Sequence, residues 1–219
     1  MLILGTKPAQ HDACFALVRD GEPLFIYEQE RFNRIKHGMS CSLSVLFDAL
    51  REHDVRPEDI DLVTSCVDPT LIPQRKQQVR GFLDSPEGDA LAEDLAWRLG
   101  TWHRLLLTAG FPEERVVSLR HHLCHCAGVY YASPFENAAI LSIDGGGEAE
   151  TAMLAHGVND HIHVLRTNPH PHSLGHFYFA LTRWLGWGYG EEGKTMALAA
   201  YDGLGSPAFS RHETSRSSG

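Results

Sequence analysis

Two histidines on one predicted helix form the most chemically specific pattern in the sequence. His121 and His125 lie four residues apart in the segment 121–131, which is predicted to be a helix. Residues at positions i and i+4 share one helix face, so both imidazoles can bind one metal ion. Asp144 ends a predicted strand and could add a carboxylate, which gives a ligand set suited to Fe(II), Zn or Mn. Two ordinary surface histidines are one alternative interpretation, and a site that uses Cys124 and Cys126 is another.

A glycine triplet follows the same predicted strand. The segment reads Asp144, Gly145, Gly146, Gly147, Glu148. Glycines allow backbone N–H groups to approach a phosphate closely, and the aspartate could hold a cation that bridges to it. A plain hairpin turn is the alternative, because glycine is common in turns.

A second polar turn, between the first two predicted strands, carries His11 beside Asp12. Imidazole titrates near neutrality, so His11 is a candidate general base, although it could also be a solvated loop histidine. A charged run from Glu28 to His37 follows the third strand. This run either forms an exposed charged edge or places Lys36 beside the substrate.

Composition limits the possible partners and the compartment. The chain has 219 residues, with 28 acidic and 19 basic side chains and a net charge of −9, which disfavours nonspecific nucleic-acid binding. No apolar run reaches the roughly 18 residues of a membrane span, and the first residues do not resemble a signal peptide. We therefore expect a cytoplasmic protein with no membrane or nucleic-acid partner. The five cysteines are expected to be reduced thiols.

The elements that must position these residues form a pattern that occurs twice. Each copy begins with three predicted strands, has a polar or glycine-rich turn after the first strand, and continues into a helix. In the first copy the strands are 2–5, 13–19 and 23–28 and the helix is 42–53. A strand (60–67), a connection (68–85), a helix (86–109), a strand (116–119) and a helix (121–131) follow. The second copy has strands 138–144, 151–156 and 162–165 and helix 174–185.

This organisation resembles the actin, hexokinase and RNase H-like superfamily, an α/β fold class of duplicated β-β-β-α units. The resemblance implies that the first-strand turns of the two halves face each other across a cleft. The sequence divides into a first subdomain at 1–135, a partial second subdomain at 136–203 and a tail at 204–219 whose composition predicts disorder. Because the second copy is incomplete, we expect a fragment, a truncated product or one piece of a split protein.

The motifs, taken in order, resemble the NodU/CmcH carbamoyltransferases and cover nearly all of residues 1–203. The matching stretches are Ile3 to Gly5 with His11 to Ala13, Val18 to Gly21, Glu28 to His37, His121 to His125, Ser133 to Glu136 with Asp144 to Glu148, Ser173 to Gly175, and Gly190 to Lys194.

The resemblance implies a division of labour between two parts of an enzyme. An N-terminal part binds iron and the hydroxyl acceptor, while a C-terminal YrdC-like region makes carbamoyl adenylate from carbamoyl phosphate and ATP. The implied metal ligands are His121, His125 and Asp144. The resemblance also makes His11 the base, places Lys36 at the acceptor site, and assigns the adenylate-binding loops to Asp144, Gly145, Gly146, Gly147, Glu148 and Gly175.

Two departures qualify this comparison. The family's Met-Gly-Leu-Ala-Pro-Tyr-Gly run appears here as Met196 to Asp202, with different residues at three positions. A fourth family ligand and the YrdC-like region are not in this chain, so that region becomes an expected partner. We expect the acceptor and metal-binding part of an O-carbamoyltransferase that modifies a small molecule or sugar in secondary-metabolite biosynthesis. An inactive or split-gene remnant and a tRNA threonylcarbamoyladenosine-type relative are the alternatives.

Overall fold

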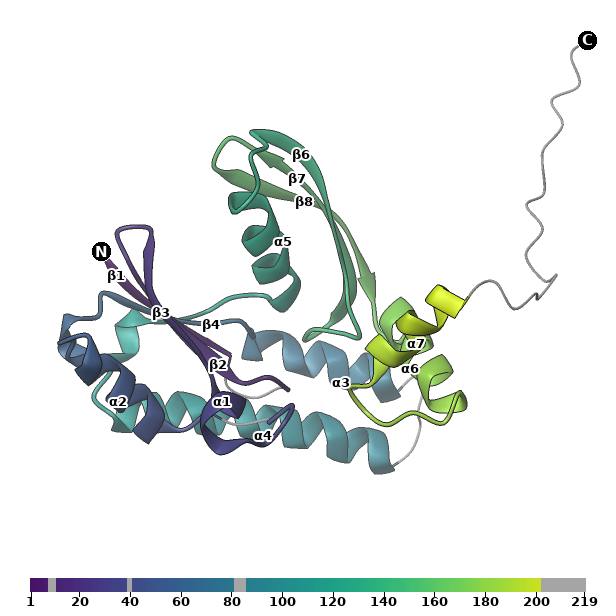
Figure 1. The fold of residues 1–219 in the computed structure, drawn as a ribbon, viewed down its shortest axis with the longest axis horizontal. Helices are drawn as coiled ribbons and strands as arrows, with labels where there is room; N and C mark the ends of the chain where they lie inside the picture. The colour runs from purple at the N-terminus through teal and green to yellow at the C-terminus, as the bar shows by residue number, and fades with distance from the viewer. Residues whose placement is uncertain (8–10, 39–40, 81–85, 202–219) are drawn as a thin grey trace, which may run out of the picture. The chain divides into compact units, whose positions relative to one another are not determined.

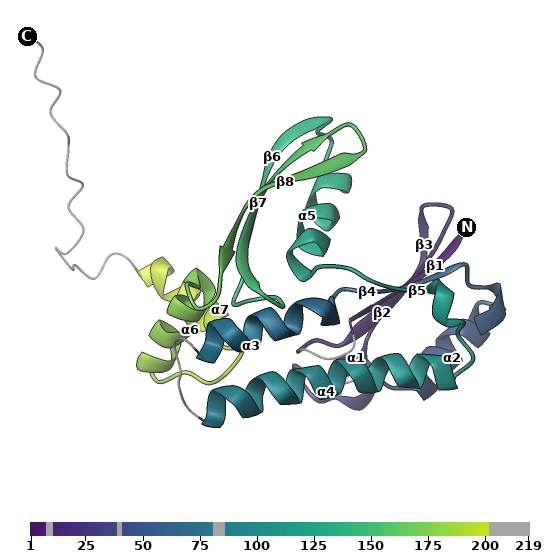
Figure 2. The same ribbon diagram turned by 180° about the vertical axis from the view of Figure 1, so that it is seen from behind.

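The computed structural model describes residues 1–7, 11–38, 41–80 and 86–201, which form two compact units (Figures 1 and 2). The first unit is Met1–Phe177 and the second is Tyr178–Gly219. The tail predicted at 204–219 lies outside the described residues, and the subdomain boundaries predicted at 135 and 203 remain predictions.

The first sheet mixes antiparallel and parallel strands in the order β3-β2-β1-β4-β5. β1, β2 and β3 pair as an antiparallel meander, whereas β4 lies parallel to β1 and β5 parallel to β4. The strands are β1 (Leu2–Lys7), β2 (Cys14–Arg19), β3 (Glu22–Glu28), β4 (Leu62–Ser65) and β5 (Val116–Ser118). Asp20 and Gly21, both at positive φ, make the tight turn predicted between β2 and β3.

Alternation of side chains along β1 and β2 directs one face of this sheet into a hydrophobic core. Leu4, Phe15 and Leu17 are almost fully buried there, against Leu50 and Leu106 from two covering helices. Those helices are α2 (Leu43–Glu52) and α4 (Pro86–Thr108), and both lie beneath the sheet in Figure 1.

The connection predicted at 68–85 contains a helix that the sequence did not reveal. α3 (Ile72–Arg80) packs against α4. It reads IPQRKQQVR, which is too polar to show the apolar periodicity of an amphipathic helix. The shorter helices of this unit are α1 (Gln29–Asn33), η1 (Pro57–Asp59), η2 (Pro69–Leu71) and η3 (Glu113–Arg115).

A second, antiparallel sheet has the order β6-β7-β8, with α5 (His121–Tyr131) packed against it. Its strands are β6 (Asn137–Ile143), β7 (Glu150–Val158) and β8 (His161–Pro169). Cys126 and Tyr130 of α5 meet Ile140, Met153 and Ala155 in a small buried core. The turn predicted at 157–160 is shorter than expected, because β7 continues to Val158.

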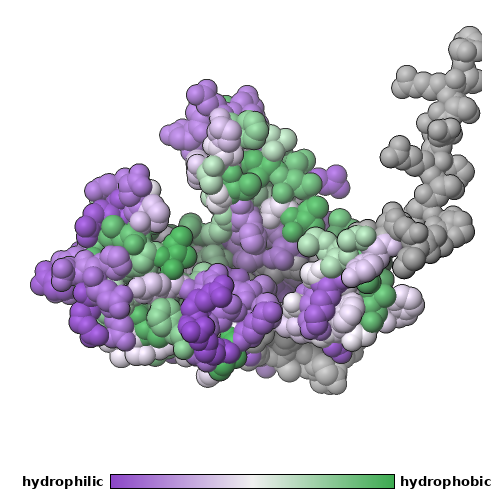
Figure 3. All heavy atoms as spheres, in the orientation of Figure 1, coloured by the Kyte–Doolittle hydropathy of each residue, from purple (hydrophilic) through white to green (hydrophobic). Residues whose placement is uncertain are grey.

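The opposite side of this second sheet exposes apolar side chains. Leu141 on β6 lies directly across from Leu154 on β7, and they are 63% and 38% exposed. Figure 3 shows hydrophobic surface over the part of the molecule where Figure 1 draws these strands.

These two sheets confirm the predicted α/β fold class of repeated β-β-β-α units. Each copy begins with a three-stranded antiparallel meander, and the first copy adds the parallel strands β4 and β5. Up to Tyr201, the described part of the second copy contains no such added strand. Among the described residues, no helix is both long and apolar enough to cross a membrane.

The second unit contains most of α6 (Leu174–Trp184) together with α7 (Glu192–Ala197) and η4 (Leu198–Tyr201). Its segment from Gly188 to Thr195 has the glycine and lysine spacing of a phosphate-binding loop. Such a loop follows a strand, whereas α6 precedes this segment. Lys194 forms an ion pair with Glu191 and lies over the Trp187 ring. The segment is therefore not built as a P-loop.

Candidate functional site

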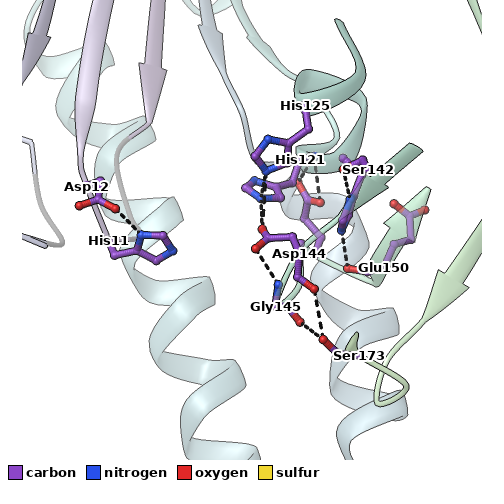
Figure 4. A network of polar contacts seen from close by, with 12 residues as sticks. His11, Asp12, His121, His125, Ser142, Asp144, Gly145, Glu150 and Ser173 are labelled. Carbon is purple, nitrogen blue, oxygen red and sulfur yellow. Dashed lines mark hydrogen bonds and ion pairs between the residues drawn. The ribbon is translucent and has the colours of Figure 1, made fainter. Parts of the chain in front are cut away.

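The structure brings three predicted metal ligands together where the first turns of α5 meet the end of β6 (Figure 4). His121 Nε2 lies 2.9 Å from Asp144 Oδ2 and 3.0 Å from His125 Nε2. His125 Nε2 lies 3.6 Å from the same carboxylate oxygen. His121 is buried, Asp144 is partly buried and His125 is exposed, so the group opens towards solvent on one side.

These separations fit three ligands of a single metal ion. Ligands at about 2.1 Å from a metal and at right angles to each other are about 3.0 Å apart. Two imidazole nitrogens that face each other at 3.0 Å need either a hydrogen on one of them, which it donates to the other, or a metal ion between their lone pairs. Two imidazoles and one carboxylate are a donor set for divalent transition metals.

The carboxylate of this group is strongly biased to its ionised form. Hydrogen bonds from His121 and His125 hold the pKa of Asp144 far below its usual value, and they outweigh the opposing effect of burial. The backbone N–H of Gly145 donates a further hydrogen bond of 2.6 Å to Asp144 Oδ1. An anionic, prearranged carboxylate is the form that binds a metal ion.

Glu148 fixes the start of the helix that carries both histidines. Its side chain is 1% exposed and accepts hydrogen bonds from the backbone N–H groups of His121 and Asp68. A carboxylate at a helix N-terminus satisfies unpaired N–H groups and interacts favourably with the helix dipole. Burial raises the pKa of Glu148 despite these bonds. The hydrogen bonds of Glu148 are with backbone N–H groups, and its place in an adenylate-binding loop stays a prediction.

His122, beside the first ligand, anchors α5 to the second sheet. It is fully buried and hydrogen-bonded to Ser142 Oγ at 2.8 Å and to the Glu150 carbonyl oxygen at 3.1 Å. Burial lowers the pKa of His122 to about 4, so its ring is neutral near pH 7. Since a carbonyl only accepts, Nε2 carries the hydrogen and Nδ1 accepts from the serine hydroxyl. The sequence contained this histidine without revealing its structural role.

The glycine triplet packs closely against histidines. A Cβ on Gly146 would lie 2.3 Å from the His170 ring, and one on Gly147 would lie 2.9 Å from Cβ of His121. Burial is the main cause that lowers the pKa of His170 to about 4, and Arg75 contributes. Arg75 on α3 donates a 2.5 Å hydrogen bond to the Gly147 carbonyl oxygen. Close packing therefore accounts for two of the glycines, independently of any phosphate.

Ser173 and Gly175 close the other side of this loop. The Ser173 hydroxyl donates to the carbonyl oxygens of Asp144 and Gly145, at 3.2 and 2.8 Å. A Cβ on Gly175 would lie 2.5 Å from their backbone, so only glycine fits at this position. The predicted loop residues from 144 to 148 and Gly175 are thus neighbours.

The predicted base lies in a separate group on the first sheet. His11 precedes β2, and its Nδ1 is 2.6 Å from Asp12 Oδ2. In Figure 4 the His11 ring points towards the side where the Asp144 group lies. Lys36 is exposed in the turn after α1, next to His37.

A second acidic side chain, Glu30, and a second histidine, His37, lie close to Asp12. Asp12, Glu30 and His37 offer three ligand atoms within 4.8 Å of one another. Two hydrogen bonds account for this proximity: His37 Nδ1 lies 2.9 Å from Asp12 Oδ1, and the His37 backbone N–H donates to Glu30 Oε2 at 3.2 Å. The sequence showed each of these residues but not their association.

The sequence is similar to that of known carbamoyltransferase-family proteins. The family described as carbamoyltransferase N-terminus matches residues 90–210. Nodulation protein NolNO of Sinorhizobium fredii (strain NBRC 101917 / NGR234) is 33% identical over 202 residues, which cover 90% of this chain and 28% of that protein. The uncharacterized protein sll1178 of Synechocystis sp. (strain ATCC 27184 / PCC 6803 / Kazusa) is 29% identical, over 91% of this chain and 34% of its own length.

The chain thus spans about a third or less of the length of these curated relatives. Among solved structures, YeaZ from Pseudomonas aeruginosa matches 77% of this chain and 67% of its own, with a TM-score of 0.43 and 14% identity.

Proposed function

This chain belongs to the carbamoyltransferase N-terminus family, and on that premise we propose that it forms the acceptor and metal-binding part of an O-carbamoyltransferase. The proposed reaction moves a carbamoyl group from carbamoyl adenylate to a hydroxyl of a small molecule or sugar. Carbamoyl adenylate would be supplied by a C-terminal region that uses ATP and carbamoyl phosphate. The acceptor would belong to secondary metabolism.

The observation that carries this proposal is the convergence of His121, His125 and Asp144, at ligand separations of 2.9–3.6 Å. These three residues would hold Fe(II) or a similar divalent ion. A bound ion would supply Lewis-acid chemistry, which stabilises negative charge on an oxygen as it develops. Glu148 supports the site by fixing the start of α5, the helix from which both histidines project.

His11 would act on the acceptor. An alcohol has a pKa far above neutrality, so its attack needs a base at the oxygen as the new bond forms. The hydroxyl oxygen bonds to the carbamoyl carbon, and the bond from that carbon to the phosphate oxygen breaks. The hydroxyl proton passes to His11, and AMP leaves with the electron pair.

The remaining predicted residues would bind the two substrates. Residues 144–148 with Gly175 would bind the adenylate, and Gly175 packs directly against the backbone of Asp144 and Gly145. Lys36, exposed in the turn beside His37, would contact the acceptor. The net charge of −9 favours a small-molecule acceptor over a nucleic acid.

The test combines this chain with the C-terminal region of a full-length relative. The mixture receives ATP, labelled carbamoyl phosphate, Fe(II) and a small-molecule extract of the source organism, and mass spectrometry identifies products enlarged by one carbamoyl group. A parallel reaction offers total tRNA instead. We expect labelled small molecules only when both protein parts are present.

Two variants separate the proposed base from general loss of structure. His11→Asn should slow transfer by about 10²- to 10⁴-fold, the usual value of a positioned general base. His163→Asn, which alters an exposed histidine on β8, should leave the rate unchanged. Label in tRNA alone, or label that does not depend on this chain, would refute the proposed function.

A further inference from the structure

We propose that Asp12 is a positioning residue that fixes the tautomer of His11, and that His37 holds Asp12 in place. This inference rests on the proposed function, in which His11 is the base. It adds two residues to which the family resemblance assigned no role.

The geometry places one carboxylate between two imidazoles. Asp12 Oδ2 lies 2.6 Å from His11 Nδ1, and Asp12 Oδ1 lies 2.9 Å from His37 Nδ1. Each carboxylate oxygen therefore serves a different ring. Asparagine could not replace it, because its amide offers one acceptor oxygen and one NH₂ donor.

The charge state of the carboxylate decides where the ring hydrogens lie. Burial alone would raise the pKa of Asp12, but the hydrogen bonds from His11 and His37 outweigh it and the pKa lies below the usual value. An ionised carboxylate only accepts hydrogen bonds, so both Nδ1 atoms must donate. In a neutral imidazole this leaves the lone pair of His11 on Nε2, the nitrogen that would take the acceptor's proton.

The backbone holds this arrangement from both sides. Asp12 has a φ of +57°, a left-handed conformation that aspartate and asparagine tolerate better than most residues. Its neighbour Ala13 donates from its backbone N–H to the Gly38 carbonyl oxygen at 3.1 Å and accepts from the backbone N–H of Gln29 at 2.9 Å. The loop that carries Lys36 and His37 is thereby attached to the start of β2.

This arrangement connects the two sides of the proposed acceptor site. The hydrogen bond between His37 and Asp12 holds the backbone at Lys36, one residue before His37, near the loop that carries His11. The backbone positions of the base and of the acceptor-binding lysine would then stay fixed relative to each other. A change at Asp12 should therefore affect the turnover step more than the folding of the chain.

Nitrogen NMR of the histidine rings tests the tautomer without any activity. The full chain is labelled with ¹⁵N-histidine, and His11→Asn identifies the signals of His11 by difference. We expect wild-type His11 to show a protonated Nδ1 and an unprotonated Nε2 near pH 8. Asp12→Asn should reduce the Nδ1–H form. Asp20→Asn is the matched control, because Asp20 also has a positive φ, of 51°, on the same sheet, and its hydrogen-bond partner is the N-terminal amino group of Met1.

The reconstituted transfer reaction then measures the consequence. Asp12→Asn should lower kcat by about 10- to 10³-fold with little change in KM, because an unoriented or wrongly protonated base reacts slowly. His37→Asn should have a smaller effect, since Asp12 can still accept from His11. Asp20→Asn should keep the wild-type rate.

Three results would overturn the inference. One is an unchanged His11 tautomer in Asp12→Asn, and another is an unchanged kcat in that variant while His11→Asn is slow. Either would leave the proposed function intact. Full activity in His11→Asn would remove both the proposed base and the reason to position it.

Discussion

Replacement of His170 by glutamine should flatten the dependence of folding stability on pH. This histidine is 5% exposed, next to Gly146, and its Nε2 lies 3.4 Å from the Gly147 carbonyl oxygen. Burial, together with the charge of Arg75, lowers the pKa of His170 from 6.5 to about 4. The folded chain therefore keeps this ring neutral at pH values where the unfolded chain protonates it.

The sign and size of the effect follow from proton linkage. Below about pH 6.5 the unfolded state binds a proton that the folded state excludes, so stability falls as the pH falls, and the loss is complete near pH 4. One pKa unit corresponds to about 1.4 kcal/mol, so a gap of roughly 2.5 units gives a loss of about 3 kcal/mol. His122, also with a pKa of about 4, adds a loss of the same sign in both wild type and variant.

Urea unfolding at about pH 7 and pH 4.5 measures this difference. At pH 7 His170→Gln should be less stable by about 1 kcal/mol, because packing beside Gly146 is lost. At pH 4.5 wild type should have lost about 2–3 kcal/mol more than the variant. His163→Gln, at an exposed position on β8, should follow wild type at both values. If the free energy of unfolding changed equally with pH in His170→Gln and in wild type, the neutral, buried state of His170 would be refuted.

Three further experiments test the helix start, the loop and the exposed sheet face. Glu148→Gln should destabilise the fold by roughly 1–2 kcal/mol in urea, because an amide has one acceptor oxygen; unchanged stability would contradict its role at α5. Gly175→Ala should lower the free energy of unfolding by about 1–3 kcal/mol, since the added Cβ would lie 2.5 Å from backbone atoms. The control Gly128→Ala, which has open space around it on α5, should raise the free energy of unfolding by up to about 1 kcal/mol. If Gly175→Ala and Gly128→Ala changed Tm in the same direction, the close approach of Gly175 to the backbone of Asp144 and Gly145 would be contradicted. The double variant Leu141→Glu/Leu154→Lys should aggregate less, as measured by light scattering, and its free energy of unfolding should change by only about 0.5 kcal/mol. A loss of several kcal/mol would show that this face of the second sheet is packed.

Local signals in the sequence predicted most of the fold. Short apolar runs predicted β1 and β2, and the pair Asp20-Gly21 predicted the turn that follows. The sequence did not predict α3, because most of its residues are polar and show no apolar periodicity. In the structure it packs against α4. β8 was predicted too short because its last residues, including Arg166 and Asn168, have no apolar periodicity.

The site was predictable only where its residues are close in sequence. The spacing of His121 and His125 placed both on one helix face. Asp144, at the end of a predicted strand, was a candidate third ligand, and the family resemblance assigned it the same role. The part played by Glu148 depends on how a loop after β6 meets the start of α5, 27 residues earlier, and no periodicity encodes that contact. The bond between Asp12 and His37 joins residues 25 positions apart and was hidden for the same reason.

The central claim is that His121, His125 and Asp144 bind one metal ion. Anaerobic calorimetric titration of Fe(II) into wild type, His125→Ala and His163→Ala tests it most directly. We predict one ion bound by wild type and by His163→Ala, with affinity at least about tenfold lower in His125→Ala, because a directly bound ligand matters at least as much as its supporting contacts. Equal affinity in wild type and His125→Ala would contradict the claim.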